Sequence, residues 1–223
     1  MKATPDPDTE ARFVPDPPDP ITPLVESWPA GTSLHTCYEV RPDGAGAGFW
    51  APPPGAPPRT YRFSDFGAPY VPVLYAGESQ ETAVAETILR NAVTGGRITR
   101  AEYARRALAR LTPTRDLRLA SLRGPGLAAL GVTARYLTDT EPFTQVYQRT
   151  VRWAEKIHTQ HPDLDGLIWM SRPRNTEACL LLFGDRFDDG DLVIENASRV
   201  FALAADRDWL AEVCDQIRVT LTA

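Results

Sequence analysis

An arginine, a tyrosine and a glutamate lie close together in the sequence, around one expected strand-to-helix turn. Arg62 precedes an apolar run at residues 71–76 that contains Tyr75, and Glu86 follows in the next expected helix. An arginine can hold a phosphate as a planar fork, a tyrosine can stack on a flat ring, and a carboxylate can stabilise positive charge on a sugar carbon. Together these side chains suit an anionic nucleotide that carries a cationic leaving group.

Each of these residues also has an ordinary structural interpretation. Glu86 could pair in solvent with Arg90 four residues later instead of facing a cleft. Arg62 could be a surface arginine, and Tyr75 a core residue with a satisfied hydroxyl. Ser171 enters a loop after an apolar strand, where α/β proteins present binding groups and where ordinary turn serines also occur. The residue types alone leave these alternatives open.

Other familiar kinds of site are not indicated. The chain contains no Gly-x-Ser-x-Gly elbow, no Walker loop and no Gly-x-Gly-x-x-Gly after a strand. Its three cysteines lack paired spacing, and its three histidines form no ligand motif. Neither a disulfide framework nor a metal site is therefore predicted.

Composition favours a single globular domain that acts on a small molecule. The 223 residues are 43% hydrophobic and carry a net charge of -5, which gives no electrostatic reason to expect direct binding to nucleic acid or to an anionic membrane. No apolar run approaches the roughly 20 residues needed to span a bilayer, and the N-terminus lacks the regions of a secretory signal. We therefore expect a cytoplasmic protein whose partner is a small metabolite or a basic protein patch.

The chain divides into an arm and one domain. Residues 1–30 are rich in Pro and Asp and predict an extended arm, either a disordered tail or a docking peptide, ahead of a domain at residues 31–223. Strands are expected near residues 34–40, 71–76, 116–122, 166–170 and 178–183, with an edge strand at 218–221.

The expected helices alternate with these strands. The signals are an N-cap at Ser79 with a stop at Gly95, and a capping box at Thr99 that opens a helix to about residue 111. Further helices are expected around residues 127–130, from about 143 to 160, and after a cap at Asp206. Strands and helices mixed in this way predict a mixed α/β (α+β) fold.

Several segments, taken in order, resemble the RES-domain family, which is named for its arginine, glutamate and serine. They are Arg62-Phe63, residues 72–79 (PVLYAGES) and residues 83–87 (AVAET), followed by residues 117–131 and by residues 152–154 and 165–172. The resemblance covers roughly residues 32–196. Arg62, Glu86 and Ser171 match the naming triad, and Tyr75 matches the tyrosine of the family's Leu-Tyr-x-Ala strand.

The resemblance implies a fold and an activity. Family members are similar to the ADP-ribosyltransferases, with twisted mixed sheets and NAD in a cleft. The implied activity is that of a toxin from a bacterial toxin–antitoxin pair, which cleaves the nicotinamide glycosidic bond of NAD by phosphorolysis or hydrolysis. The implied catalytic residues are Glu86, Arg62 and Ser171, and the implied substrate-binding residues are Arg62, Tyr75 and Ser171.

The same resemblance implies the partners. NAD is the substrate, so no cofactor is expected, and inorganic phosphate or water is the acceptor. An Xre-type antitoxin is the expected protein partner, and the oligomeric state, with a homodimer among the options, stays open.

One position departs from the family pattern. Members usually carry an arginine in the first strand where this chain has Thr36, and Thr36 cannot pair with a phosphate as a charge. Two alternatives to an NAD-degrading enzyme therefore stay in view. One is an ADP-ribosyltransferase that modifies a protein, and the other is a nucleotide-binding or partner-binding module that has lost catalysis.

Overall fold

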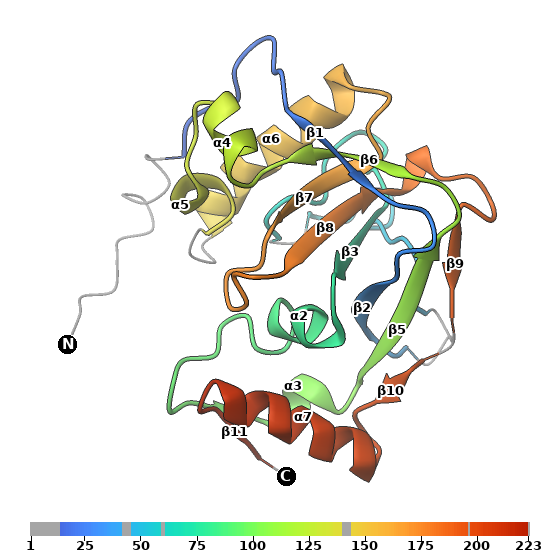
Figure 1. Cartoon of the computed structure of the whole chain (residues 1–223), viewed down its shortest axis with the longest axis vertical. Helices are drawn as coiled ribbons and strands as arrows, with labels where there is room; N and C mark the ends of the chain where they lie inside the picture. The colour runs from blue at the N-terminus through green and yellow to red at the C-terminus, as the bar shows by residue number, and fades with distance from the viewer. Residues whose placement is uncertain (1–13, 42–45, 59–60, 140–143, 196, 223) are drawn as a thin grey trace.

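A curled, mixed β-sheet forms the centre of the molecule (Figure 1). The computed structural model describes residues 14–41, 46–58, 61–139, 144–195 and 197–222. Within these residues nine strands join one sheet in the order β1-β6-β7-β8-β3-β2-β5-β10, and β9 also pairs with β5. Only the β6–β7 ladder in this sheet is parallel. The strands are β1 (Val25–Trp28), β2 (Leu34–Glu39), β3 (Val73–Gly77), β5 (Arg106–Pro113), β6 (Leu117–Ser121), β7 (Gly166–Met170), β8 (Ala178–Phe183), β9 (Leu192–Ile194) and β10 (Arg199–Val200).

Helices lie on both sides of this sheet and at one end of the molecule (Figure 1). They are α2 (Gln80–Ala85), α3 (Arg100–Tyr103), α4 (Pro125–Ala129), α5 (Ala134–Leu137), α6 (Thr144–Gln160) and α7 (Ala204–Gln216), with a 3₁₀ turn at Gly184–Arg186. A second sheet pairs β4 (Arg97–Ile98) with β11 (Thr220–Leu221). The mixed α/β fold predicted from the sequence is confirmed.

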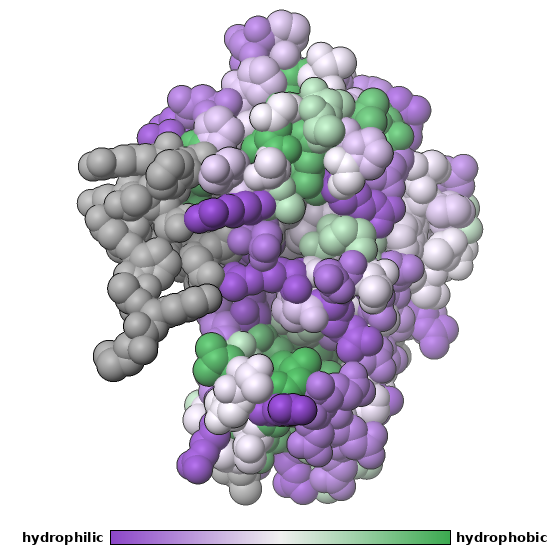
Figure 2. All heavy atoms as spheres, turned by 60° about the vertical axis from the view of Figure 1, so that its left-hand side comes forward, coloured by the Kyte–Doolittle hydropathy of each residue, from purple (hydrophilic) through white to green (hydrophobic). Residues whose placement is uncertain are grey.

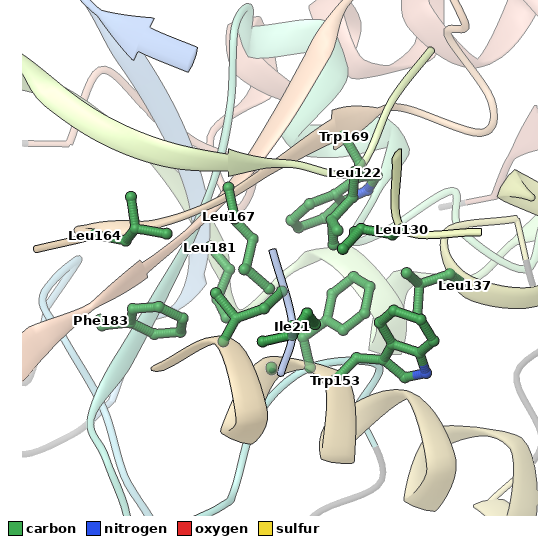
Figure 3. Packing of buried hydrophobic residues seen from close by; sticks show 14 of the residues in the cluster. Ile21, Leu122, Leu130, Leu137, Trp153, Leu164, Leu167, Trp169, Leu181 and Phe183 are labelled. Atoms are coloured by element: carbon green, nitrogen blue, oxygen red, sulfur yellow. The ribbon is translucent and has the colours of Figure 1, made fainter. Parts of the chain in front are cut away.

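The apolar central strands separate two layers of core. In β8, Leu181 and Phe183 join the cluster beneath α6, whereas Leu180 and Leu182 join the cluster on the opposite face. Figure 3 shows Trp153 of α6 among the side chains of the first cluster. Burial on both faces explains why these strands are continuous apolar runs rather than alternating ones.

A third cluster supports the helix that carries Glu86. Val84, Ile88 and Leu89 pack with Tyr103 and with residues of α7. Burying an aliphatic side chain contributes about 1.5–3 kcal/mol, so this cluster fixes α2 against the sheet.

Two helix predictions were too long. The helix that begins at the Ser79 cap ends at Ala85 rather than near Gly95. The residues after it form turns in which Ile88 and Leu89 are still buried, so their spacing resembles that of a helix. The capping box at Thr99 is confirmed, but its helix ends at Tyr103.

The predicted helix was also wrong in type over residues 106–111, which lie in the strand β5 instead. β5 pairs with β2 along six residues, and Ala107, Leu108 and Ala109 are all buried. A short apolar run that is buried on both faces has no strict alternation, and therefore cannot be distinguished from a buried helix by periodicity alone.

The described part of the N-terminal arm packs against the domain. Val14 and Ile21 are buried, the Trp153 indole N–H donates to the Pro15 carbonyl at 2.8 Å, and β1 pairs with β6. Residues 1–13 lie outside the described residues. The domain boundary at residue 30 stays a prediction, and residues 14–28 contribute to the core and the sheet edge.

The remaining predicted elements agree closely with the structure, apart from one cap. The expected start of the long helix at residue 143 lies outside the described residues. Helix α7 begins at Ala204, and Asp206 lies in its first turn, where its carboxylate accepts a hydrogen bond from the Val200 N–H at 2.8 Å. The apolar residues visible in Figure 2 lie in separate patches among hydrophilic ones. Among the described residues, no helix has the length and apolar character required to cross a membrane.

Candidate functional site

A cavity of about 720 Å³ opens beside β2, β3 and α2. Its wall includes aromatic side chains from several elements, among them Trp50, Tyr75 and Trp169, and the charged groups Arg62 and Glu86. A volume of this size, with apolar walls and a few converging polar groups, is typical of small-molecule sites, which span about 300–1,000 Å³. Figure 1 shows α2 beside β3, the arrangement that brings the helix end to the cavity.

Arg62 is a buried cation at this wall. Its side chain belongs to a residue only 2% exposed, and its Nε has no hydrogen-bond partner among the described residues. The Thr150 hydroxyl of α6 donates to the Arg62 carbonyl, and neighbouring Phe63 packs edge-on against Trp169. Burial lowers the pKa of Arg62, and the nearby Arg90 lowers it further. The neighbouring Glu86 offsets only part of this cost of burial, so an anion entering the cavity would stabilise the cation further.

Tyr75 supplies an aromatic surface rather than an ionisable group. It lies on β3, and its hydroxyl accepts a hydrogen bond from the Phe63 N–H at 3.1 Å. Its ring centroid is 6.3 Å from that of Trp169 and 6.5 Å from that of Tyr61. Burial raises the pKa of Tyr75, so the side chain stays a neutral phenol at neutral pH. The ring can therefore pack on a flat ligand group.

Glu86 lies at the C-terminal cap of α2 and faces the cavity. Its Oε1 accepts two hydrogen bonds of 2.9 Å, one from the Ser171 hydroxyl and one from the Arg172 backbone N–H. The alternative interpretation, in which Glu86 and Arg90 pair in solvent, does not match the structure, because Arg90 donates to the Tyr147 hydroxyl. The loop after β7 thus fixes the Glu86 carboxylate through these two hydrogen bonds.

A small side pocket adjoins the cavity at Glu86. Its volume is about 10 Å³, and it shares Arg62, Glu86, Arg90 and Tyr147 with the main cavity. Such a volume accommodates about one water molecule. The side pocket therefore offers room for a small reactant next to the carboxylate.

Ser171 reaches the cavity only through Glu86. The residue is 1% exposed, and it is absent from the described lining of both the cavity and the side pocket. Its oxygen also accepts a hydrogen bond from the Arg174 N–H at 3.3 Å. A direct contact between Ser171 and a ligand stays a prediction, whereas its contact with Glu86 is part of the fold.

The loop that carries Ser171 is tied to both ends of α2. Besides the bonds to Glu86, the carboxylate of Glu177 at the end of the loop accepts from the hydroxyls of Ser79 and Thr82. Ser79 caps α2 by accepting from the Thr82 N–H at 3.0 Å. These bonds fix the position of the helix, and with it the position of Glu86.

Two further residues at the site were not predicted from the sequence. Arg90 donates to the Tyr147 hydroxyl at 2.5 Å, with its guanidinium carbon 5.2 Å from the ring centroid. Both residues line the cavity and the side pocket. No sequence spacing connects them, because they are 57 positions apart and Tyr147 looks like any apolar-face residue of a long helix.

The cavity does not offer an activated thiol. Cys37 and Cys179 line it, but burial raises the pKa of Cys37 to about 12 and raises the pKa of Cys179 well above its ordinary value. Both are therefore protonated at neutral pH and are poor nucleophiles. Thr36 is also in the cavity wall, 6% exposed. Within the described residues, no group of three or more His, Cys, Asp or Glu side chains could hold a metal ion.

Comparison with protein-family models gives a match to one family. The model of the RES domain matches residues 35–206, a span that includes Arg62, Tyr75, Glu86 and Ser171. A comparison with curated proteins gives no match. Among solved structures, the chain is similar to one in the crystal structure of the M. tuberculosis MbcT-MbcA toxin-antitoxin complex. That match has 13% identity and a TM-score of 0.49, and it covers 78% of this chain and 85% of the other.

Proposed function

The chain belongs to the RES domain family, and from this premise we propose that it is an enzyme that cleaves the nicotinamide glycosidic bond of NAD. The observation that carries the proposal is the placement of Glu86. Its carboxylate faces a cavity of nucleotide size, is fixed by two hydrogen bonds, and lies near a buried arginine whose Nε has no hydrogen-bond partner in the described part of the chain. That combination suits an anionic substrate in which positive charge develops on a sugar.

The reaction would proceed by loss of nicotinamide from the ribose. The C–N bond breaks with its electron pair going to the ring nitrogen, so nicotinamide leaves as a neutral ring and positive charge develops on the ribose carbon and ring oxygen. The Glu86 carboxylate stabilises that charge. An oxygen of phosphate or water then bonds to the carbon and loses its proton to the Glu86 carboxylate, giving phosphorylated ADP-ribose or ADP-ribose.

The other residues bind and orient the substrate. Arg62 holds the diphosphate through its planar guanidinium fork. Tyr75 packs on the nicotinamide ring. Ser171 keeps Glu86 in place through the 2.9 Å hydrogen bond and thereby acts as a positioning residue.

The biological role that accompanies this activity is that of a growth-inhibiting toxin in a bacterial toxin–antitoxin pair. Depletion of NAD would stop growth, and an Xre-type antitoxin that covers the cavity would prevent it. Expression of the chain in bacteria should therefore arrest growth and lower cellular NAD, and expression of a Glu86→Gln variant should do neither.

The decisive test is nicotinamide release from NAD by the purified chain, with and without inorganic phosphate. Glu86→Gln should lower kcat by about a hundredfold to a thousandfold, because it removes charge stabilisation in the transition state. Glu155→Gln, which changes an exposed glutamate of α6, is the matched control and should retain activity.

The outcomes of this test distinguish the possible activities from one another. Release that requires phosphate indicates a phosphorylase, and release without phosphate indicates a glycohydrolase. A protein that becomes labelled by NAD carrying a labelled adenylate indicates an ADP-ribosyltransferase. Equal turnover in Glu86→Gln and in the unaltered chain would rule out the role given to Glu86.

A further inference from the structure

We propose that Arg90, together with Arg62, forms a binding site for a phosphate group where the cavity meets its side pocket. This inference rests on the proposed function for the origin of the phosphate, which is either the diphosphate of NAD or the inorganic phosphate acceptor. The arrangement of the two arginines is independent of that choice.

The position of Arg90 is the first observation. It lies four residues after Glu86, is half-buried, and lines both the cavity and the side pocket, as Arg62 does. A group bound at their junction would thus meet two guanidinium groups and lie beside the proposed reacting centre. Arginine is suited to this task because its planar fork matches a phosphate.

The balance of charge at the side pocket is the second observation. Among its described lining residues, Glu86 is the one carboxylate, and its Oε1 already accepts hydrogen bonds from Ser171 and Arg172. A third arginine, Arg172, lies 3.1 Å from a carboxylate oxygen of Asp139. Arg62 and Arg90 therefore face a single carboxylate at the side pocket. Burial lowers the pKa of Arg62 most, and the nearby Arg90 lowers it further. A bound anion would offset the repulsion between them.

The third observation is that Arg90 is held in place by a neutral residue. Its Nη2 donates to the hydroxyl of Tyr147, a residue that is only 3% exposed. This bond uses one of the five N–H donors of the guanidinium, which leaves others for a ligand. Tyr147 in turn packs with Val14 and Val146, so the described N-terminal segment supports the orientation. A neutral partner fixes the arginine without neutralising it.

The test measures binding rather than turnover. Calorimetric titrations with NAD, with pyrophosphate and with inorganic phosphate would be made on the full chain carrying Glu86→Gln, so that NAD is not consumed. The same titrations would follow with Arg90→Gln added, and with Arg118→Gln added as the matched control. Arg118 is exposed on β6 and pairs with Asp163 outside the cavity.

We expect Arg90→Gln to weaken at least one of these ligands about tenfold or more, because it removes charge-assisted hydrogen bonds to a phosphate. Weaker NAD and pyrophosphate binding would identify the substrate diphosphate as the source, and weaker inorganic phosphate binding alone would identify the acceptor. Arg118→Gln should leave all three affinities within about twofold, since rim or distant charges contribute little.

Unchanged affinity for all three ligands in a folded Arg90→Gln protein would overturn the proposal, as would the lack of any binding by the parent protein. If Arg90→Gln does not fold, Tyr147→Phe replaces it. That variant removes the acceptor that orients Arg90 and should weaken the same ligand several-fold, and its failure to do so would count equally against the site. If instead the proposed function is wrong, the unaltered chain will release no nicotinamide from NAD, although its anion binding still depends on Arg90.

Discussion

The Ser171 hydroxyl donates to Glu86 Oε1 at 2.9 Å, although the two residues are 85 positions apart. The bond joins the end of α2 to the loop after β7, and the Arg172 N–H reinforces it from the same loop. Because Ser171 is buried and outside the described cavity lining, its effect on a reaction would pass through the orientation of the carboxylate.

Ser171→Ala should therefore lower kcat for nicotinamide release by about tenfold to a hundredfold, the cost of a misplaced catalytic group. KM for NAD should stay within about threefold, since a positioning residue acts mainly on the transition state. Ser198→Ala, which removes a hydroxyl that donates to the Leu108 carbonyl at 3.3 Å, is the control for loss of a serine outside the site. A raised KM with unchanged kcat would instead place Ser171 on the substrate.

Glu177 should make the stability of the protein depend on acidic pH. Burial raises its pKa, but hydrogen bonds from Ser79, Thr82 and Arg174 lower it by more, so the pKa lies below the ordinary value of 4.5. A carboxylate with a lowered folded-state pKa stabilises the protein fully above its unfolded-state pKa, and that contribution is lost as pH falls through the folded-state pKa.

Denaturant unfolding of the unaltered chain and of Glu177→Gln, compared between pH 7 and pH 3, should show this effect. The unaltered chain should be the more stable at pH 7, and the difference in unfolding free energy should shrink as pH falls below about 4.5. Taking the difference removes the contributions of other acidic groups. A difference that is constant with pH would mean that Glu177 acts through packing rather than through its charge.

The sequence predicted some strands with their correct bounds and one strand wrongly as a helix. The strands Gly166–Met170 and Ala178–Phe183 were predicted with their observed bounds because their apolar runs are continuous and bounded by polar residues. Most of β5 was predicted as a helix because it closely follows the capping box at Thr99, and because Arg106 and Arg110 interrupt its apolar residues so that no continuous apolar run marks the strand.

The same contrast applies to the site. Arg62, Tyr75 and Glu86 could be found because they lie within 25 residues and share one strand-to-helix turn. The Arg90–Tyr147 contact and the Ser171–Glu86 bond depend on tertiary packing between distant elements, which no local spacing encodes. The role of Tyr147 could be identified only once α6 was placed against the cavity.

Gly166 should be among the least replaceable residues of the fold. A Cβ at this position would lie 2.0 Å from the Leu181 carbonyl oxygen of the adjacent strand, a contact that neither backbone can relieve without moving. Gly166→Ala should lower the unfolding free energy by about 1–3 kcal/mol, as overpacking does. Gly48→Ala, where a Cβ meets no atom within 4 Å, is the control and should unfold like the parent protein. Equal stability of the two variants in denaturant unfolding would contradict this packing argument.

Replacing Arg62 should separate binding from stability. Arg62→Met removes a buried cation whose Nε has no described partner and leaves a flexible apolar chain in its place. It should raise the unfolding free energy by about 1 kcal/mol or more, because the desolvation cost of the charge disappears. The same change should weaken NAD binding at least about tenfold, since the charged fork for the diphosphate is lost.

The control is Arg118→Met, at an exposed site, which should change the unfolding free energy by no more than about 0.5 kcal/mol. Denaturant unfolding of the three proteins, and NAD titration of the same three with Glu86→Gln added so that NAD is not consumed, measure both effects. A destabilised Arg62→Met protein would show that the fold itself requires this cation.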